Sequence, residues 1–176
     1  FIIICLSSTI AAFPPMAVVL LGGIITSKIM MMDSLATVPM TLMVIGIAIT
    51  APFASRFMSI LGRQKGFLFS SLLSSLALIL CSFAIYFENF YIFAIGNFLI
   101  GSSQAFIHLY RFAASESVLK EHIPRSISIV LLLGIVSALL SSNLADYFKD
   151  FFPNSLFLGS YIFLSFTAII PFFILL

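Results

Sequence analysis

The sequence predicts an all-α membrane protein with six transmembrane helices, and three observations support this. The chain is 62% hydrophobic and only 8% charged, whereas a soluble domain carries about 25% charged residues. Its apolar residues fall into long continuous runs, each close to the roughly 20 residues that a helix needs to cross a bilayer. Most of its Lys and Arg residues gather in two connections between those runs, a bias typical of loops on one side of a membrane.

Each apolar run is expected to be a helix, because only helices and closed barrels satisfy the backbone in lipid and barrel strands alternate over about ten residues. The expected helices cover residues 1–27, 35–53, 67–87, 90–111, 127–147 and 156–176. Pro14 and Pro15 are expected to kink or break the first helix, and interrupted helices are typical of transporter sites. We expect residues 1–176 to form one six-helix bundle, with two groups of three helices meeting at Glu88 and Asn89.

The distribution of charge predicts how the bundle is oriented. Six of the eight Lys and Arg residues lie in the second and fourth connections or at their edges: Arg56, Arg63, Lys65, Arg111, Lys120 and Arg125. The opposite connections hold Lys28 and Lys149 together with the acidic residues Asp33, Glu88, Asp146 and Asp150. Positively charged loops are retained in the cytoplasm. The amino terminus and the end of the sixth helix are therefore also expected to be cytoplasmic.

Composition also argues against several functions. Eight basic residues without basic-aromatic alternation do not suit a nucleic-acid surface. Cys5 and Cys81 lie inside apolar runs and are interpreted as small hydrophobic core residues. The methionines at positions 30–32 are interpreted as interfacial. We therefore expect no metal site and no cofactor.

The fourth expected helix carries a polar stripe. Its members are spaced by 4, 3, 4 and 3 residues and so share one helix face: Asn97, Gly101, Gln104, His108 and Arg111. Polar groups in membrane helices usually face the bundle interior or a water-filled cavity. We interpret Asn97, Gln104, His108 and Arg111 as the wall of a substrate path, with Arg111 at its inner mouth. Hydrogen bonding between helices is the alternative, and His108 is either a proton carrier or only a hydrogen-bonded side chain.

Small polar residues in two other helices have different interpretations. Gly66, Ser70 and Ser74 repeat every four residues in the third helix, which favours close helix packing. The set in the fifth helix is compatible with packing or with a path: Ser128, Gly134, Ser137, Ser141, Ser142 and Asn143. The hydroxyls of Ser7, Ser8 and Thr9 lie near the proline pair and are candidates for ligand contacts.

The stretch Gly62-Arg63-Gln64-Lys65-Gly66 resembles motif A of the major facilitator superfamily, a cytoplasmic loop motif that acts as a charge clamp. Gly62, Arg63 and Lys65 match its C-terminal part. Its first half is not matched, because serines or isoleucine stand at the positions of its Gly, Asp and Arg: Ser55, Ser59 and Ile60. Arg63 is still expected to bond helix-end carbonyls.

Four further segments are similar, in order and spacing, to one little-described bacterial branch of that superfamily: 35–39, 62–63, 110–114 and 127–134. The resemblance implies the amino-terminal six-helix half of a twelve-helix permease. Two departures stand against proton coupling and antiport. Asn97 occupies the Arg position of motif B, four residues before Gly101, and Ser141, Ser142 and Asn143 stand where antiporters have Gly-Pro.

The resulting prediction is a secondary transporter of the major facilitator type, not an enzyme, in the inner membrane of a bacterium. Its expected partners are a small-molecule solute, the lipid bilayer and a C-terminal six-helix half, with no nucleic acid. One alternative is a non-transporting membrane subunit or a remnant. Another is an intramembrane serine enzyme, but Ser102 and Ser103 lie six and five residues before His108, spacings that do not stack on a helix face.

Overall fold

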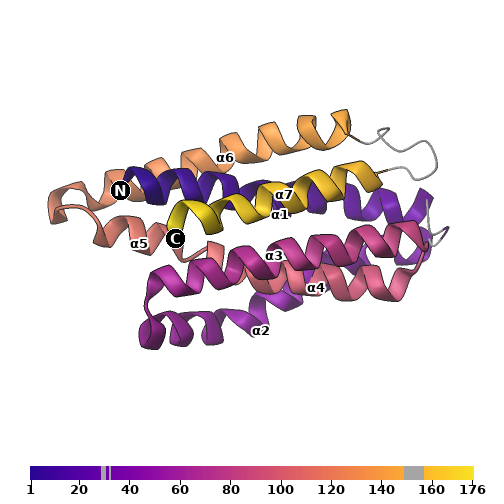
Figure 1. Ribbon diagram of the computed structural model, residues 1–176, viewed down its shortest axis with the longest axis horizontal. Helices are drawn as coiled ribbons and strands as arrows, with labels where there is room; N and C mark the ends of the chain where they lie inside the picture. Colours follow the sequence, from indigo (N-terminus) through magenta and orange to yellow (C-terminus); the bar gives the residue numbers. More distant parts are fainter. Residues whose placement is uncertain (29–30, 32, 149–156) are drawn as a thin grey trace.

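The structure is a computed structural model, and it describes residues 1–28, 31, 33–148 and 157–176 (Figure 1). Its elements in chain order are α1 (Ile2–Lys28), η1 (Asp33–Leu35), α2 (Val38–Leu61), α3 (Arg63–Tyr86), α4 (Phe90–Ile107), α5 (Tyr110–Glu116), η2 (Lys120–His122), α6 (Ile123–Tyr147) and α7 (Leu158–Leu175). The sequence-based interpretations of Met30, Met32, Lys149, Asp150 and the first residue of the sixth helix lie outside the described residues.

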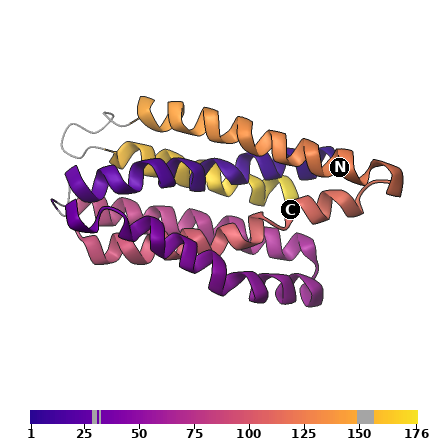
Figure 2. The same ribbon diagram turned by 180° about the vertical axis from the view of Figure 1, so that it is seen from behind.

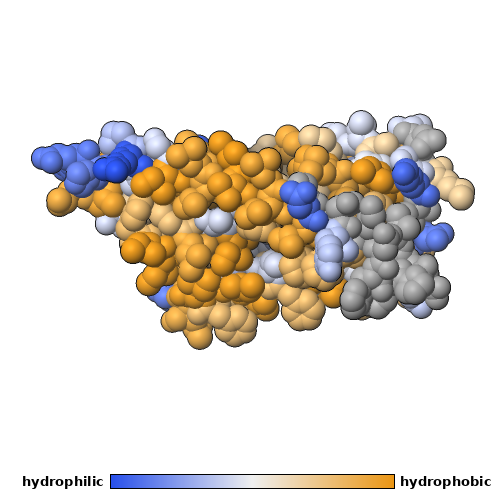
Figure 3. All heavy atoms as spheres, turned by 90° about the horizontal axis from the view of Figure 1, so that it is seen from above, coloured by the Kyte–Doolittle hydropathy of each residue, from blue (hydrophilic) through white to orange (hydrophobic). Residues whose placement is uncertain are grey.

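The prediction of six transmembrane helices is confirmed. The described residues contain six helical segments that are long and apolar enough to cross a membrane, with α4 and α5 together forming one of them. No strand occurs in the described part of the chain. Figure 3 shows hydrophobic residues over most of the visible face, with the largest group of hydrophilic residues at its left end. The chain is therefore an all-α protein built for a lipid environment.

The second connection differs from the loop expected over residues 55–66. Helix α2 continues to Leu61 and α3 begins at Arg63, so a single residue, Gly62, joins them. Gly62 has φ +89° and ψ 156°, a backbone conformation that is essentially restricted to glycine. The expected loop was wrong because the polar residues after Phe53 mark the end of the apolar run. A helix continues past the lipid wherever its backbone hydrogen bonds remain favourable.

Two other helices also depart from expectation. Helix α1 runs without interruption through Pro14 and Pro15, so the break allowed by the sequence is absent. The fourth span ends at Glu116 instead of Arg111, and it contains an irregular turn at His108 and Leu109. There the Leu109 N–H donates to the Phe106 carbonyl at 3.0 Å, an i→i−3 bond that tightens the helix.

Helix packing has an exchange symmetry. Helices α1, α2 and α3 correspond to α4, α6 and α7, in that order. The contact of α2 with α4 corresponds to that of α6 with α1, and the contact of α3 with α4 corresponds to that of α7 with α1. Helices α3 and α7 pack on each other. Exchanging α1, α2 and α3 with α4, α6 and α7 therefore leaves the set of main contacts unchanged (Figures 1 and 2). This is the packing expected for two three-helix units. Both chain ends lie toward the end of the bundle that carries Gly62 and the connection from α5 to α6.

Close contact between α2 and α4 depends on two glycines. A Cβ added to Gly101 would lie 2.0 Å from the Met43 carbonyl oxygen, and one added to Gly46 would lie 2.3 Å from the Phe98 carbonyl oxygen. The two backbones are thus in direct contact, as small residues allow in membrane helices. This contact holds the polar face of α4 in place relative to the rest of the bundle.

Serine hydroxyls fasten α3 to its neighbours. The Oγ of Ser70 donates to the Ser103 carbonyl on α4 at 3.0 Å, and the Oγ of Ser75 donates to the Ser165 carbonyl on α7 at 3.1 Å. Ser71 likewise donates to Ala168 of α7 at 2.6 Å. The packing interpretation of the small residues in the third helix is confirmed.

Candidate functional site

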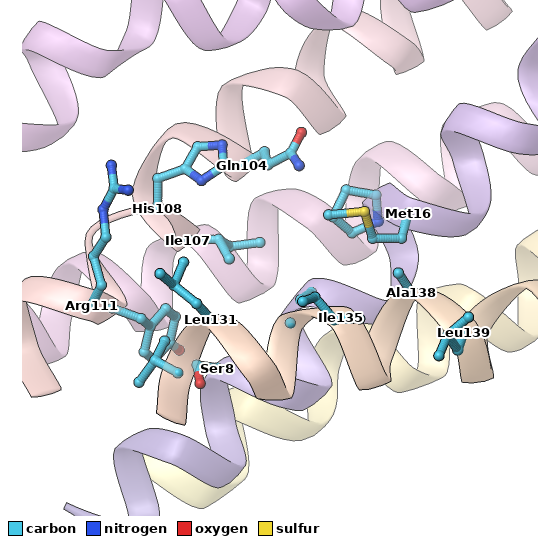
Figure 4. A pocket seen from close by; sticks show the side chains of 15 residues that line it. Ser8, Met16, Gln104, Ile107, His108, Arg111, Leu131, Ile135, Ala138 and Leu139 are labelled. Atoms are coloured by element: carbon cyan, nitrogen blue, oxygen red, sulfur yellow. The ribbon is translucent and has the colours of Figure 1, made fainter. Parts of the chain in front are cut away.

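A cavity of about 360 Å³ lies between α1, the α4–α5 segment and α6 (Figure 4). Its volume falls in the range of about 300–1,000 Å³ that small-molecule sites occupy. In Figure 4, Gln104, His108 and Arg111 follow one wall, while Leu131 and Ile135 of α6 lie across from them. Met16 and Ser8 of α1 complete the wall.

Three members of the predicted polar stripe meet at this cavity. Gln104 is 7% exposed, and its Oε1 accepts no hydrogen bond from the described residues. His108 and Arg111 are exposed, and the Arg111 Cζ lies 5.3 Å from the centre of the Phe112 ring. The irregular turn at His108 carries the stripe from α4 into α5, so these three side chains still face a common space.

The other two members of the stripe lie elsewhere. Asn97 is 1% exposed and does not line the cavity; its Nδ2 donates to the Phe93 carbonyl at 2.8 Å, and a Cβ on Gly22 would lie 3.9 Å from its Oδ1. Gly101 lies against the α2 backbone. Along α4, the stripe therefore faces α1 and α2 at Asn97 and Gly101, and it faces the cavity from Gln104 onward. The role of Asn97 in a substrate path stays a prediction.

Most of the cavity wall is apolar, and apart from Pro15 and Gly134 its apolar residues were not singled out in the sequence. Helix α6 contributes Val130, Leu131, Gly134, Ile135, Ala138 and Leu139, and α1 contributes Ala12, Pro15 and Met16. Two signals pointed to these helices: the proline pair of α1 and the glycine in the undecided set of the fifth helix. Nothing lies within 4 Å of a Cβ added to Gly134, so this glycine widens the cavity instead of permitting helix contact.

One hydroxyl of α6, that of Ser137, reaches across to α1. The Ser137 Oγ lies 2.7 Å from the Thr9 carbonyl oxygen of α1 and 2.8 Å from that of Leu133 in its own helix. Ser8 lines the cavity, and its Oγ donates to the Cys5 carbonyl at 2.8 Å. Of the three hydroxyls expected near the proline pair, Ser8 is thus the one at the cavity wall.

Gly62, Arg63 and Lys65 were predicted to form a cytoplasmic loop motif. In the structure, Arg63 joins the start of α3 to another helix. Arg63 forms an ion pair with Glu116 at the end of α5, with its Nε donating to Oε2 at 2.6 Å and its Nη2 to Oε1. Gln64 donates to the Leu175 carbonyl at the end of α7, so the expected bond to a helix-end carbonyl comes from the neighbour of Arg63. Lys65 is exposed on α3.

The serines considered for an enzyme are engaged with their own helix. Ser102 donates to the Phe98 carbonyl at 3.0 Å and Ser103 to the Ile100 carbonyl at 2.8 Å. Neither residue lines the cavity that contains His108. A hydroxyl that donates its proton to a carbonyl is not paired with a general base, which a serine nucleophile requires.

Comparison with known proteins gives one match to report. The chain is 28% identical over 161 residues to a riboflavin transporter, RfnT, of Brucella anthropi. The match covers 92% of the chain and 40% of that transporter, so the chain spans well under two thirds of its relative's length. No protein-family model matches the chain. No solved structure matches it either.

Proposed function

We propose that this chain is one half of a secondary transporter that carries a small solute across a membrane. The observation that carries the proposal is the gathering of an amide, an imidazole and a guanidinium around one cavity between membrane-crossing helices. Ionisable groups within membrane spans mark solute and ion pathways by default. In this proposal Gln104, His108 and Arg111 belong to the solute path, with Asn97 deeper in the same helix.

We further propose that the transporter is of the major facilitator type, in a bacterial inner membrane, and that a C-terminal six-helix half completes the path. Packing of two exchangeable three-helix units suits the repeat architecture of such transporters. The match to less than half of a longer transporter leaves room for a second block of helices. Large apolar side chains on α2 and α6 are exposed, among them Phe53 at 68% and Leu132 at 61%. Lipid or the second half would cover them.

The proposed solute is a flat heteroaromatic molecule of the riboflavin class. The relative is named as a riboflavin transporter. Leu131, Ile135 and Met16 provide apolar walls for a ring, and the polar groups along the opposite wall provide hydrogen bonds. Among the described residues, one cation and no carboxylate line the cavity, which favours a neutral or anionic solute over a cation.

The test is uptake of labelled riboflavin by cells that lack their own riboflavin uptake and express the full-length protein. Uptake above the empty-vector level supports the proposal. Gly134→Leu places a side chain in the cavity without a clash in the helix, and we expect it to lower uptake about tenfold or more because the space for the ring is lost. Leu76→Phe enlarges a residue of α3 that is 64% exposed and outside the cavity, and it should leave uptake unchanged.

Two results would contradict the proposal. Equal uptake with and without the protein would remove riboflavin as the solute. Unchanged uptake in the Gly134→Leu variant would place the path away from this cavity. Both variants are checked for equal amounts in the membrane before uptake is compared.

A further inference from the structure

A groove of about 580 Å³ lies between α3 and α7, and it shares no lining residue with the cavity between α1, α4–α5 and α6. Small buried side chains form part of its lining, namely Ser75 and Ser82 of α3 and Ser165 of α7. Each helix also contributes large exposed side chains, among them Phe83 of α3 and Phe166 of α7. Serines beside exposed phenylalanines leave a channel along the helix pair.

The groove runs lengthwise along both helices. On α3 its lining extends from Ser75 to Phe87, and on α7 from Leu158 to Ile169. At 1.5 Å per residue these ranges correspond to about 18 Å and about 16 Å. Because α3 and α7 are antiparallel, Phe87 and Leu158 mark one end of the groove and Ser75 and Ile169 the other. A hydrocarbon core about 30 Å thick gives each leaflet about 15 Å, so the groove is about as long as one leaflet is deep.

The hydroxyls in the groove are already engaged with backbone carbonyls. The Ser75 Oγ donates to the Ser165 carbonyl at 3.1 Å. The Ser82 Oγ donates to the Leu78 carbonyl at 2.9 Å. The Ser165 Oγ donates to the Ile162 carbonyl at 2.7 Å. Among the described residues, no charged side chain lines the groove. It therefore suits an uncharged, apolar occupant and not a polar solute.

The groove is continuous with the lipid-facing surface of the bundle. Leu76 of α3 and Phe173 of α7 are exposed apolar residues outside it on the same two helices, and both helices are long and apolar enough to cross a membrane. In Figure 1, α7 lies in front of α1 and α3 in front of α4, and Figure 2 shows the opposite order. Since α1 and α4 line the cavity, the groove and the cavity open on different faces.

A lipid chain gains more from such a groove than from a smooth helix surface. Bulk lipid is as apolar as the groove, so the hydrophobic effect does not distinguish them. Dispersion attraction does, because a chain in a groove touches protein atoms on several sides and each carbon–carbon contact adds a small amount. Tyr86 also lines the groove and lies next to Phe87 at its end, and tyrosines are typical of the level of the lipid headgroups.

We propose that this groove binds one acyl chain of a membrane phospholipid, from the leaflet at the end of the bundle where Phe87 and Leu158 lie. The methyl end of the chain points toward Ser75 and Ile169, and its ester end lies near Tyr86. The bound chain fills the space between α3 and α7. This inference does not depend on which solute the protein carries.

The experiment maps a photoactivatable lipid on the full-length protein. The protein is placed in nanodiscs of phosphatidylcholine that contain a small fraction of phosphatidylcholine with a diazirine near the methyl end of one chain. After irradiation, the labelled residues are identified by mass spectrometry. Labelling at Ile79 and Ile169 in the groove is expected to exceed that at Leu76 by about threefold or more, because the groove adds many dispersion contacts.

Two variants change the groove in different ways. Phe166→Ala removes an exposed wall, and Ser82→Leu fills the floor without breaking a bond between helices, since Ser82 donates only within α3. Each should reduce labelling at Ile79 to the level at Leu76. Phe173→Ala is the matched control for Phe166→Ala, because both phenylalanines are 67% exposed on α7 and only Phe166 lines the groove. It should keep the wild-type pattern.

Three results would overturn the inference. Equal labelling of Ile79, Ile169 and Leu76 in wild-type protein would show ordinary surface lipid. Preferential labelling that survives in both Phe166→Ala and Ser82→Leu would place the lipid elsewhere. Cross-linking of two copies through Phe83→Cys in native membranes, in a background without Cys5 and Cys81, would show that a second copy covers the groove. Failure of riboflavin uptake leaves the inference standing, because no part of this test uses the solute.

Discussion

Arg63, the first residue of α3, forms a two-point ion pair with Glu116, the last residue of α5. The two residues are 53 positions apart in the sequence. Their side chains are 33% and 61% exposed, and the pairing through Nε and Nη2 has the planar geometry that favours Arg over Lys. The contact joins the end of the α4–α5 segment, which carries the cavity-lining polar residues, to the start of α3.

We expect this ion pair to stabilise the bundle modestly. A double-mutant cycle with Arg63→Gln and Glu116→Gln should give a coupling energy of about 0.5–1 kcal/mol, the upper part of the range for exposed pairs, because the geometry is bidentate. The measurement is thermal unfolding of the purified protein in detergent at low and high salt. Arg63→Lys should lose part of the coupling. Additive effects of the two single variants would show that the pair contributes nothing.

Aqueous access to α4 should follow the cavity and not the full length of the stripe. In a background without Cys5 and Cys81, single cysteines at positions 104, 108 and 111 are expected to react with a water-soluble thiol reagent in native membranes. Cysteine at position 97 should be unreactive, because Asn97 is 1% exposed and, unlike Gln104, does not line the cavity. Phe98 and Leu109 supply the off-stripe controls. Reaction at position 97 as fast as at position 108 would mean that the path extends deeper than the cavity.

The two glycines at positions 101 and 134 should respond oppositely to the same substitution. Gly101→Ala forces a Cβ into the Met43 backbone, and we expect it to lower the free energy of unfolding by about 2 kcal/mol or more, at the upper end of overpacking costs. Gly134→Ala meets open space, and it should be neutral or slightly stabilising, since Ala favours helix over Gly. The measurement is the thermal unfolding of the wild-type protein and of both variants in the same detergent. A neutral Gly101→Ala would show that α2 and α4 are not in backbone contact.

The orientation of the bundle can be measured by labelling its two ends. Lys120 lies in the basic connection and is exposed, and Tyr91 lies near the opposite end and is 75% exposed. By the positive-inside rule, Lys120→Cys should react only in inside-out vesicles and Tyr91→Cys only in right-side-out vesicles. The reverse pattern would place the amino terminus outside.

Local composition determined much of the fold. Six apolar runs and the absence of water in the bilayer leave the chain no alternative to helices, so the number and approximate position of the spans follow from sequence. The interpretation of the small residues in the third helix also held, because short side chains such as Ser70 let helix backbones approach closely, and its hydroxyl reaches a carbonyl of α4. The ends of the helices could not be predicted from the apolar runs. Helix α2 continues well past its apolar run and ends at Gly62, whose backbone conformation terminates it.

Tertiary structure alone decided which polar residues share a space. The stripe from Asn97 to Arg111 is one face of a helix in the sequence, but whether each position meets α2, α1 or a cavity depends on helix crossing. Gly101 is set against the Met43 backbone by that crossing, and Gln104 is set against the cavity. The partner of Arg63 could not be predicted from the sequence either. An ion pair between residues 53 positions apart forms only when packing brings the two helix ends together. Periodicity fixes the direction of a side chain relative to its own helix, whereas the neighbour it meets is fixed by the free energy of the whole bundle.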